Sequence, residues 1–289
     1  MFRYLAWGLP AAMVSCITLP PDSSPGAQAA CFWFAVLFFV AIAAHLMDVT
    51  VRWESQWPEG RKRSLAFLLS GSLLVWGLLF YTGRAGLWRG GVPAIVFSAN
   101  LLLMAGLVGR WLASGIRRPS ELLPVCAVVC AADLVSFFKG PTGAMADGVA
   151  AYYAAGMVGP PPWADFLLVK IPVPGISNWV PLFGVTDWAV AACLTDAYRR
   201  LSLDRAGARG EGASRGVMNA FPSPAVAGLL AAIVLAHVTG RFVPGMPMMV
   251  LFYLPVLLAR SRQARRPRRH EVWLALLFPL VIALAGRLM

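Results

Sequence analysis

The chain has 289 residues, of which 59% are hydrophobic and only 13% are charged. Soluble domains carry about 25% charged residues, so this composition excludes a soluble protein and indicates one that lies within a lipid bilayer. A membrane-spanning helix needs about 20 apolar residues. Most of the chain is therefore expected to form spanning helices, with little left for a domain outside the membrane.

The net charge of +12 comes from 25 Lys and Arg residues, which cluster in the connections between apolar runs, most densely at 260–269. Basic connections of this kind anchor a membrane protein against anionic lipid headgroups on the cytoplasmic side. We therefore expect anionic lipids, and not nucleic acid, as partners of the basic loops. The five cysteines lie in or beside apolar runs without a paired CxxC spacing, which is typical of small core residues and not of a metal site.

Nine apolar runs predict an all-α polytopic membrane protein with about nine transmembrane helices. The runs cover residues 4–19, 29–51, 64–81, 92–112, 122–138, 180–198, 225–239, 246–259 and 272–288. With alternating direction, the N-terminus and every second connection carry most of the Lys and Arg residues. This asymmetry predicts a bacterial-type inner (plasma) membrane protein with its N-terminus inside and the 139–179 loop outside. The first run also resembles a secretory signal with a small-residue cleavage site at 27–29, and cleavage would remove one helix.

The order of these runs predicts three regions. Residues 1–120 hold four membrane helices, residues 121–260 hold two aspartate-bearing helices and a proline segment, and residues 261–289 hold a basic loop and the last helix. The connection at 139–179 is much longer than the others. Its Ala-rich part, 143–158, predicts a short interfacial helix. The prolines that follow predict extended backbone at 166–171.

Two aspartates within predicted spans are the main candidates for chemistry, because ionisable side chains in a membrane are costly and mark functional sites. Asp133 and Asp187 lie about five and about seven residues from the outer ends of successive predicted helices, at a depth on the order of 8–10 Å. Two such carboxylates suit peptide hydrolysis. Like charges about 3 Å apart cannot both ionise, so one carboxylate takes a proton from water while the protonated partner polarises the scissile carbonyl.

Three short motifs surround these aspartates. Residues 133–135 read Asp-Leu-Val and are followed by Lys-Gly-Pro at 139–141, while 182–187 read Leu-Phe-Gly-Val-Thr-Asp and 243–247 read Val-Pro-Gly-Met-Pro. In this order they resemble the first aspartate segment, the Gly-x-Gly-Asp segment and the Pro-Ala-Leu segment of the presenilin and signal peptide peptidase family. The resemblance covers about residues 124–259.

The resemblance implies an intramembrane aspartyl protease with Asp133 and Asp187 as the catalytic dyad. It implies no metal or organic cofactor, and transmembrane helices or signal-peptide remnants as substrates. Prolines in the 244–247 segment would leave strand-like edges to which an unwound substrate pairs, and residues 166–171 and 180–183 are further candidate edges. The substrate-binding residues that the resemblance implies are Lys139, Gly184, Thr186, Pro244, Gly245, Met246 and Pro247.

The chain also departs from the family pattern. Ala132 stands where the family usually has tyrosine, Thr186 replaces the glycine before the second aspartate, and Gly245-Met246 replaces Ala-Leu. The predicted topology places the catalytic loop outside, as in signal peptide peptidases and not as in presenilins. A non-cleaving relative therefore remains an alternative.

Other interpretations of the ionisable residues stay open. A small transporter or binding protein would use Asp133 and Asp187 for a proton, an ion or a partner helix, although the internal repeats usual in transporters are not visible. His45 and Asp48 have a spacing that suits a metal site, but an ordinary interhelical hydrogen bond is the simpler interpretation. Asp196, beside two arginines, predicts an ion pair at the cytoplasmic end of its helix.

Overall fold

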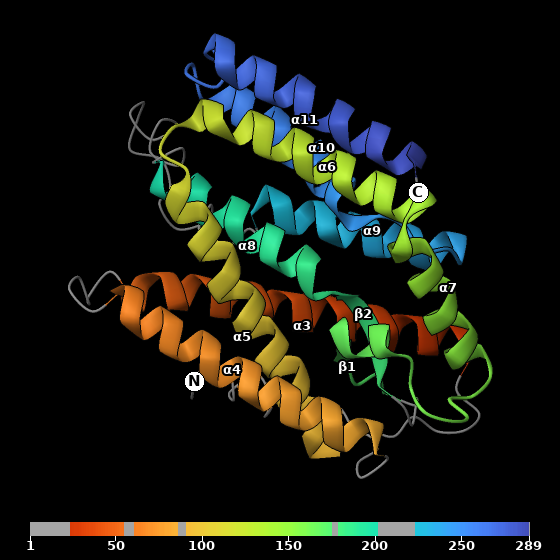
Figure 1. The fold of residues 1–289 in the computed structure, drawn as a ribbon. Helices are drawn as coiled ribbons and strands as arrows, with labels where there is room; N and C mark the ends of the chain where they lie inside the picture. The colour runs from red at the N-terminus through yellow and green to blue at the C-terminus, as the bar shows by residue number, and fades with distance from the viewer. Residues whose placement is uncertain (1–23, 55–60, 86–90, 175–178, 202–222, 289) are drawn as a thin grey trace. The chain divides into compact units, whose positions relative to one another are not determined.

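The computed structural model describes residues 24–54, 61–85, 91–174, 179–201 and 223–288, which are mostly helical with one small sheet (Figure 1). The predicted all-α class is confirmed in this main feature. The α-helices are α3 (Pro25–Glu54), α4 (Arg61–Arg84), α5 (Gly91–Gly115), α6 (Leu122–Lys139), α7 (Pro141–Ala154), α8 (Val185–Arg200), α9 (Pro224–Thr239), α10 (Gly245–Arg260) and α11 (Arg269–Leu288). The other elements are the 3-10 helices η1 (Pro119–Glu121) and η2 (Trp163–Leu167) and the strands β1 (Leu168–Ile171) and β2 (Val180–Gly184).

Five of the described helices are long and apolar enough to cross a membrane, as expected for a membrane protein. The candidate spans are Pro25–His45, Ala66–Arg84, Pro93–Gly115, Pro119–Lys139 and Arg269–Gly286. Helices α9 and α10 are apolar but shorter. Large apolar side chains such as Phe67, Leu74 and Leu276 are exposed on α4 and α11, which suits contact with lipid.

The predicted runs correspond closely to these helices, with two exceptions. The run at 4–19, including its predicted signal-peptide alternative, lies outside the described residues. The run at 180–198 was predicted as one helix, but its first five residues form strand β2 and the helix begins only at Val185. Pro181 and Gly184 explain this difference, since both residue types disfavour a helix interior.

The chain folds into two compact units, which are described separately. Unit 1 comprises Met1–Leu107 and Ala151–Trp188, and unit 2 comprises Val108–Ala150 and Ala189–Met289. The three regions predicted from the sequence, with boundaries at 120 and 260, stay a prediction. The two compact units are interleaved along the chain, because the second half of the long loop folds with the N-terminal helices.

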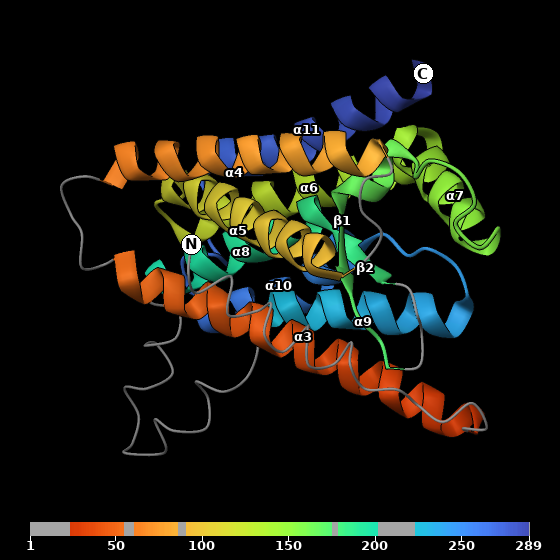
Figure 2. The same cartoon turned by 90° about the horizontal axis from the view of Figure 1, so that it is seen from below.

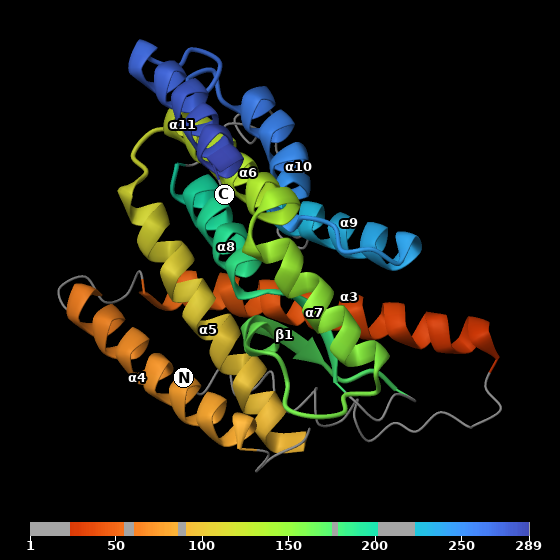
Figure 3. The same cartoon turned by 45° about the vertical axis from the view of Figure 1, so that its right-hand side comes forward.

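Unit 1 contains the sheet, which is visible beside α5 in Figures 2 and 3. Strands β1 and β2 pair antiparallel, with Leu168 opposite Gly184 and Ile171 opposite Val180. The register shifts between Val169 and Lys170, as expected for a β-bulge. The extended backbone predicted at 166–171 is thus confirmed for 168–171, while the two preceding residues end η2.

Unit 2 is built from helices that approach each other closely at glycines. A Cβ atom on Gly228 of α9 would lie 2.5 Å from the carbonyl oxygen of Met248 in α10. A Cβ atom on Gly286 of α11 would lie 2.3 Å from Cγ1 of Val135 in α6. Small residues at such crossings are typical of helix packing in membranes.

The polar contact between Ser120 and Glu271, whose Oγ and Oε1 atoms are 3.0 Å apart, joins the starts of α6 and α11. Together with the Gly286–Val135 contact near their other ends, it shows that α6 and α11 run parallel. This agrees with the predicted alternation, in which both helices are odd-numbered spans.

The connection after α6 folds as its sequence predicts. Gly140 ends α6 and Pro141 begins α7, so the Lys-Gly-Pro motif marks a break between two helices. The hydroxyl groups of Ser136 and Thr142 share a hydrogen bond across this break. Helix α7 (Pro141–Ala154) confirms the short helix predicted at 143–158.

Candidate functional site

Asp133 lies on α6 and reaches the start of α10. Its Oδ2 atom accepts a hydrogen bond of 3.1 Å from the backbone N–H of Met246, the second residue of α10. The carboxylate is only partly exposed. The first amides of a helix have no partner within the helix, and its N-terminus attracts negative charge. The first candidate aspartate therefore binds directly to the predicted proline segment.

The proline segment presents a backbone donor to the Asp133 carboxylate at the start of α10. Pro244 is the N-cap of α10, with extended backbone at φ −61° and ψ 122°. Gly245 is buried, and Pro247 has no backbone N–H to satisfy. Met246 thus offers an amide donor at the helix start, and Asp133 fills that position.

Asp187 lies in the first turn of α8. Its Oδ2 atom accepts a hydrogen bond of 3.1 Å from the backbone N–H of Gly184, the last residue of β2. This is the carboxylate half of a capping box, in which the third helical residue reaches back to the N-cap amide. A Cβ atom on Gly184 would lie only 3.1 Å from the same carboxylate oxygen. Glycine at this position therefore allows the carboxylate to approach the strand end.

The position of Asp187 corrects one sequence-based expectation. The predicted depth assumed helical rise for the residues before it, but residues 180–184 form a strand. A strand rises about 3.3 Å per residue, compared with 1.5 Å for a helix. The matched-depth estimate therefore does not hold for Asp187, which lies at a strand-to-helix junction and not two turns inside a helix.

An aromatic pair packs around this junction. The rings of Phe183 and Trp188 stack with centroids 5.3 Å apart and planes 19° from parallel. Trp188 is fully buried. The pair brackets the turn between β2 and α8, so it holds the backbone that carries Asp187.

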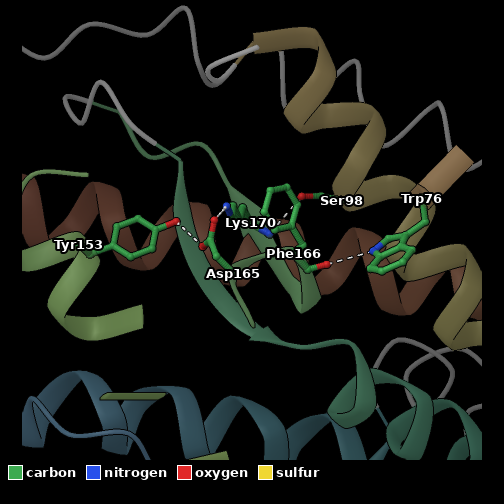
Figure 4. A network of polar contacts seen from close by, with 6 residues as sticks. All are labelled: Trp76, Ser98, Tyr153, Asp165, Phe166 and Lys170. Carbon is green, nitrogen blue, oxygen red and sulfur yellow. Dashed lines mark hydrogen bonds and ion pairs between the residues drawn. The ribbon is translucent and has the colours of Figure 1, made fainter. Parts of the chain in front are cut away.

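A polar network that the sequence analysis missed lies on the hairpin side of unit 1 (Figure 4). Asp165 is 3% exposed. It accepts a hydrogen bond of 3.0 Å from the Tyr153 hydroxyl and forms an ion pair with Lys170. Burial, followed by the nearby Asp165 charge, raises the pKa of the Tyr153 phenol, which keeps it a protonated donor. The network ties the end of α7 to strand β1.

The same loop is anchored to α4 and α5. The Trp76 indole donates a hydrogen bond of 3.1 Å to the Phe166 carbonyl oxygen, and the Lys170 backbone N–H donates one of 3.1 Å to Ser98 Oγ. The buried Phe166 ring contacts Phe80 at a centroid distance of 4.8 Å. Figure 4 shows the hydrogen bonds of Trp76 and Ser98 to this loop. The sequence signal that could have indicated this network is the pair of opposite charges, Asp165 and Lys170, five residues apart in a proline-rich loop of a chain with few charges.

Other predicted site residues fall into two groups. Lys139 and Thr186 are exposed, at the end of α6 and at the start of α8 respectively. The metal interpretation of His45 and Asp48 cannot be followed, because the Asp48 side chain lies outside the described residues. Within the described part of the chain, no group of three or more His, Cys, Asp or Glu side chains is placed to hold a metal ion.

The ion pair predicted for Asp196 is confirmed. Its Oδ2 atom lies 3.4 Å from Nε of Arg200, one turn further along α8.

The structure thus brings Asp133 together with the proline segment in unit 2, and Asp187 together with Gly184 in unit 1. The pairing of the two aspartates joins residues of different units and stays a prediction. Comparison of the chain with protein-family models, with curated proteins and with solved structures finds no match.

Proposed function

We propose that this protein is an intramembrane aspartyl protease that hydrolyses peptide bonds in transmembrane segments. The observation that carries the proposal is the hydrogen bond from Met246 N–H to Asp133. Three motifs resembling one protease family occur in the expected order, and this bond joins two of them across 113 residues of chain. Asp133 and Asp187 would form the dyad, within a protein of about nine spans.

The chemistry follows from two carboxylates that share one proton. The ionised carboxylate takes a proton from water, and the water oxygen forms a bond to the scissile carbonyl carbon. The protonated carboxylate donates its proton to the carbonyl oxygen. When the tetrahedral intermediate collapses, the ionised carboxylate takes a proton from one hydroxyl of the intermediate, the C–N bond breaks, and the leaving nitrogen takes a proton from the other carboxyl group. The dyad then again shares one proton. In each aspartate, one carboxylate oxygen accepts a hydrogen bond from a backbone N–H. This bond holds the carboxylate in position and leaves its other oxygen to exchange protons.

The substrate would be a single transmembrane helix, such as a signal-peptide remnant, that unwinds before cleavage. Strand β2 ends at Gly184, directly before Asp187, so a substrate strand added to this sheet would pass beside the second aspartate. The prolines at 244–247 would border the same groove, with Lys139 and Thr186 at its exposed margin. The protein would lie in an inner membrane with its N-terminus inside and the 139–179 loop outside.

The test is cleavage of a panel of transmembrane peptides by the full chain in liposomes. We expect wild-type protein to cleave, and Asp133→Ala and Asp187→Ala to reduce cleavage to background. Asp147→Ala is the matched control, because Asp147 is an exposed carboxylate on α7 outside the proposed site. A transition-state-mimicking aspartyl protease inhibitor should block wild-type cleavage. Equal loss in the Asp147 variant would contradict the assignment of the dyad.

One observation favours a second, non-catalytic function. Both candidate carboxylates accept a backbone N–H at the start of a helix, which is also what a purely structural cap does. In that case the protein would be a non-cleaving relative or a small transporter that binds a proton, an ion or a helix at these aspartates. Absence of wild-type cleavage, together with no inhibitor binding, would select this function.

A further inference from the structure

Several helix ends of unit 2 meet at one end of that unit. The Arg200 side chain at the end of α8 donates hydrogen bonds to the carbonyl oxygens of Ala113 and Ile116, which lie at the end of α5. Ser120 and Glu271 join the starts of α6 and α11. The connections α5–α6 and α10–α11 therefore lie side by side.

The α10–α11 connection, predicted only as a basic tether, is an ordered turn. Ala264 is fully buried in the hydrophobic core of unit 2, and its N–H donates a hydrogen bond of 3.1 Å to Ser261 Oγ. Ser261 and Ala264 are buried and fix the backbone of the turn, while the arginine side chains beside them are exposed. The exposed arginines of the two connections are Arg117, Arg118, Arg262, Arg265, Arg266, Arg268 and Arg269.

Two carboxylates at this end of the unit, Glu121 and Glu271, accept hydrogen bonds from backbone N–H groups. Glu121 Oε2 accepts the backbone N–H of Arg117 at 2.7 Å, and Glu271 Oε2 accepts that of Arg268 at 2.6 Å. Glu271 is also 1% exposed. Both acids are used to fix the turns, so they contribute little at the outer surface, where the guanidinium groups dominate.

Two exposed tryptophans border the arginines. Trp111 is 59% exposed near the end of α5, and Trp273 is 68% exposed near the start of α11. Tryptophan is enriched where a membrane protein crosses from hydrocarbon to headgroups. Arginine binds phosphate oxygens through its planar fork of donors. A surface that combines exposed tryptophan and arginine is therefore suited to contact lipid headgroups.

We propose that the surface formed by these seven arginines and by Trp111 and Trp273 binds the phosphate groups of anionic phospholipids. The surface is pre-organised, because the Ser120–Glu271 hydrogen bond joins its two connections and buried Ile116 and Ala264 anchor them in the core of unit 2. This proposal concerns a partner and not the chemistry of the aspartates. It therefore holds or fails independently of protease activity.

The test uses the full chain in vesicles of equal parts phosphatidylglycerol and phosphatidylcholine, extracted into polymer-bounded lipid discs. The measurement is the ratio of the two lipids in the disc relative to the bulk vesicle. We expect enrichment of phosphatidylglycerol with wild-type protein, and a fall of about twofold or more in Arg117→Gln/Arg266→Gln, since each basic residue near the surface adds to the attraction. Raising the salt concentration should weaken the enrichment.

The matched control is Arg84→Gln/Arg241→Gln, which removes two exposed arginines that are not among the seven of this surface. This variant should retain the wild-type enrichment. All four arginines are exposed, so both double variants should fold, and their unfolding midpoints in detergent check this. A wild-type ratio equal to the bulk, or equal losses in the two variants, would overturn the proposal.

Discussion

The two units hold their candidate aspartates by different means. In unit 1, Asp187 binds the amide of Gly184, three residues away in the chain, and the surrounding hairpin is held by a polar network. In unit 2, Asp133 of α6 binds the amide of Met246 in α10, 113 residues away, and each of these helices packs closely against a glycine of another helix. The first arrangement depends on local backbone geometry, and the second depends on the packing of the whole helix group.

This difference predicts which substitutions disturb which aspartate. A change in the polar network of unit 1 should loosen the hairpin that leads to Asp187. A change at a helix crossing of unit 2 should move the start of α10 away from Asp133. A substitution in one unit that disturbs the aspartate of the other unit would contradict this assignment.

The largest effect is expected from Asp165→Ala. It leaves the Lys170 ammonium and the Tyr153 hydroxyl without their shared carboxylate. Removing one partner of a buried ion pair costs about 3–5 kcal/mol, and the value should lie at the lower end because Lys170 keeps 17% side-chain exposure. Unfolding in mixed detergent micelles measures the loss, and amide hydrogen exchange should show it first in β1 and β2.

The control is the double variant Asp165→Leu/Lys170→Met, which removes both charges. It should recover much of the lost stability, because replacing both partners by apolar groups is often neutral. Equal destabilisation by the single and the double variant would mean that the ion pair does not hold the hairpin.

The corresponding change in unit 2 is Gly228→Ala. Its new Cβ atom would lie 2.5 Å from a backbone oxygen and 2.6 Å from Cα of Met249, so α9 and α10 must move apart. Overpacking of this kind costs about 1–3 kcal/mol. Gly77→Ala in α4 is the matched control, since nothing lies within 4 Å of its Cβ position. Stability unchanged in the Gly228 variant would contradict the close crossing.

Most of the helices could be predicted from the sequence, because a membrane-spanning helix needs a continuous run of apolar residues. The break at Lys139-Gly140-Pro141 and the ion pair of Asp196 were also predictable, since both depend on residues close in the chain. The contact between Asp133 and Met246 is long-range. Only the order of the motifs, and no local pattern, indicated that these segments belong together.

The hairpin was the hardest part to predict. Residues 180–184 continue directly into α8 and are as apolar as a span, so hydropathy alone does not distinguish strand from helix there. The Asp165 network depends on the folded loop, which brings Tyr153 to a carboxylate twelve residues later. The composition of the loop does not indicate that Tyr153 and Asp165 lie close together.

The smallest effect on stability is expected at Asp187, where Asp187→Ala and Asp187→Asn distinguish the loss of the hydrogen bond from the loss of the charge. The alanine variant loses the bond to Gly184 N–H and should cost about 0.5–2 kcal/mol, as for other lost caps. Asparagine keeps an acceptor oxygen and should retain most of that stability, yet it cannot act as a base. Unfolding and peptide cleavage measured on both variants distinguish the two roles. If the Asp187→Asn variant is as unstable as the Asp187→Ala variant, a neutral acceptor does not replace the carboxylate, and the hydrogen bond to Gly184 depends on the charge of Asp187.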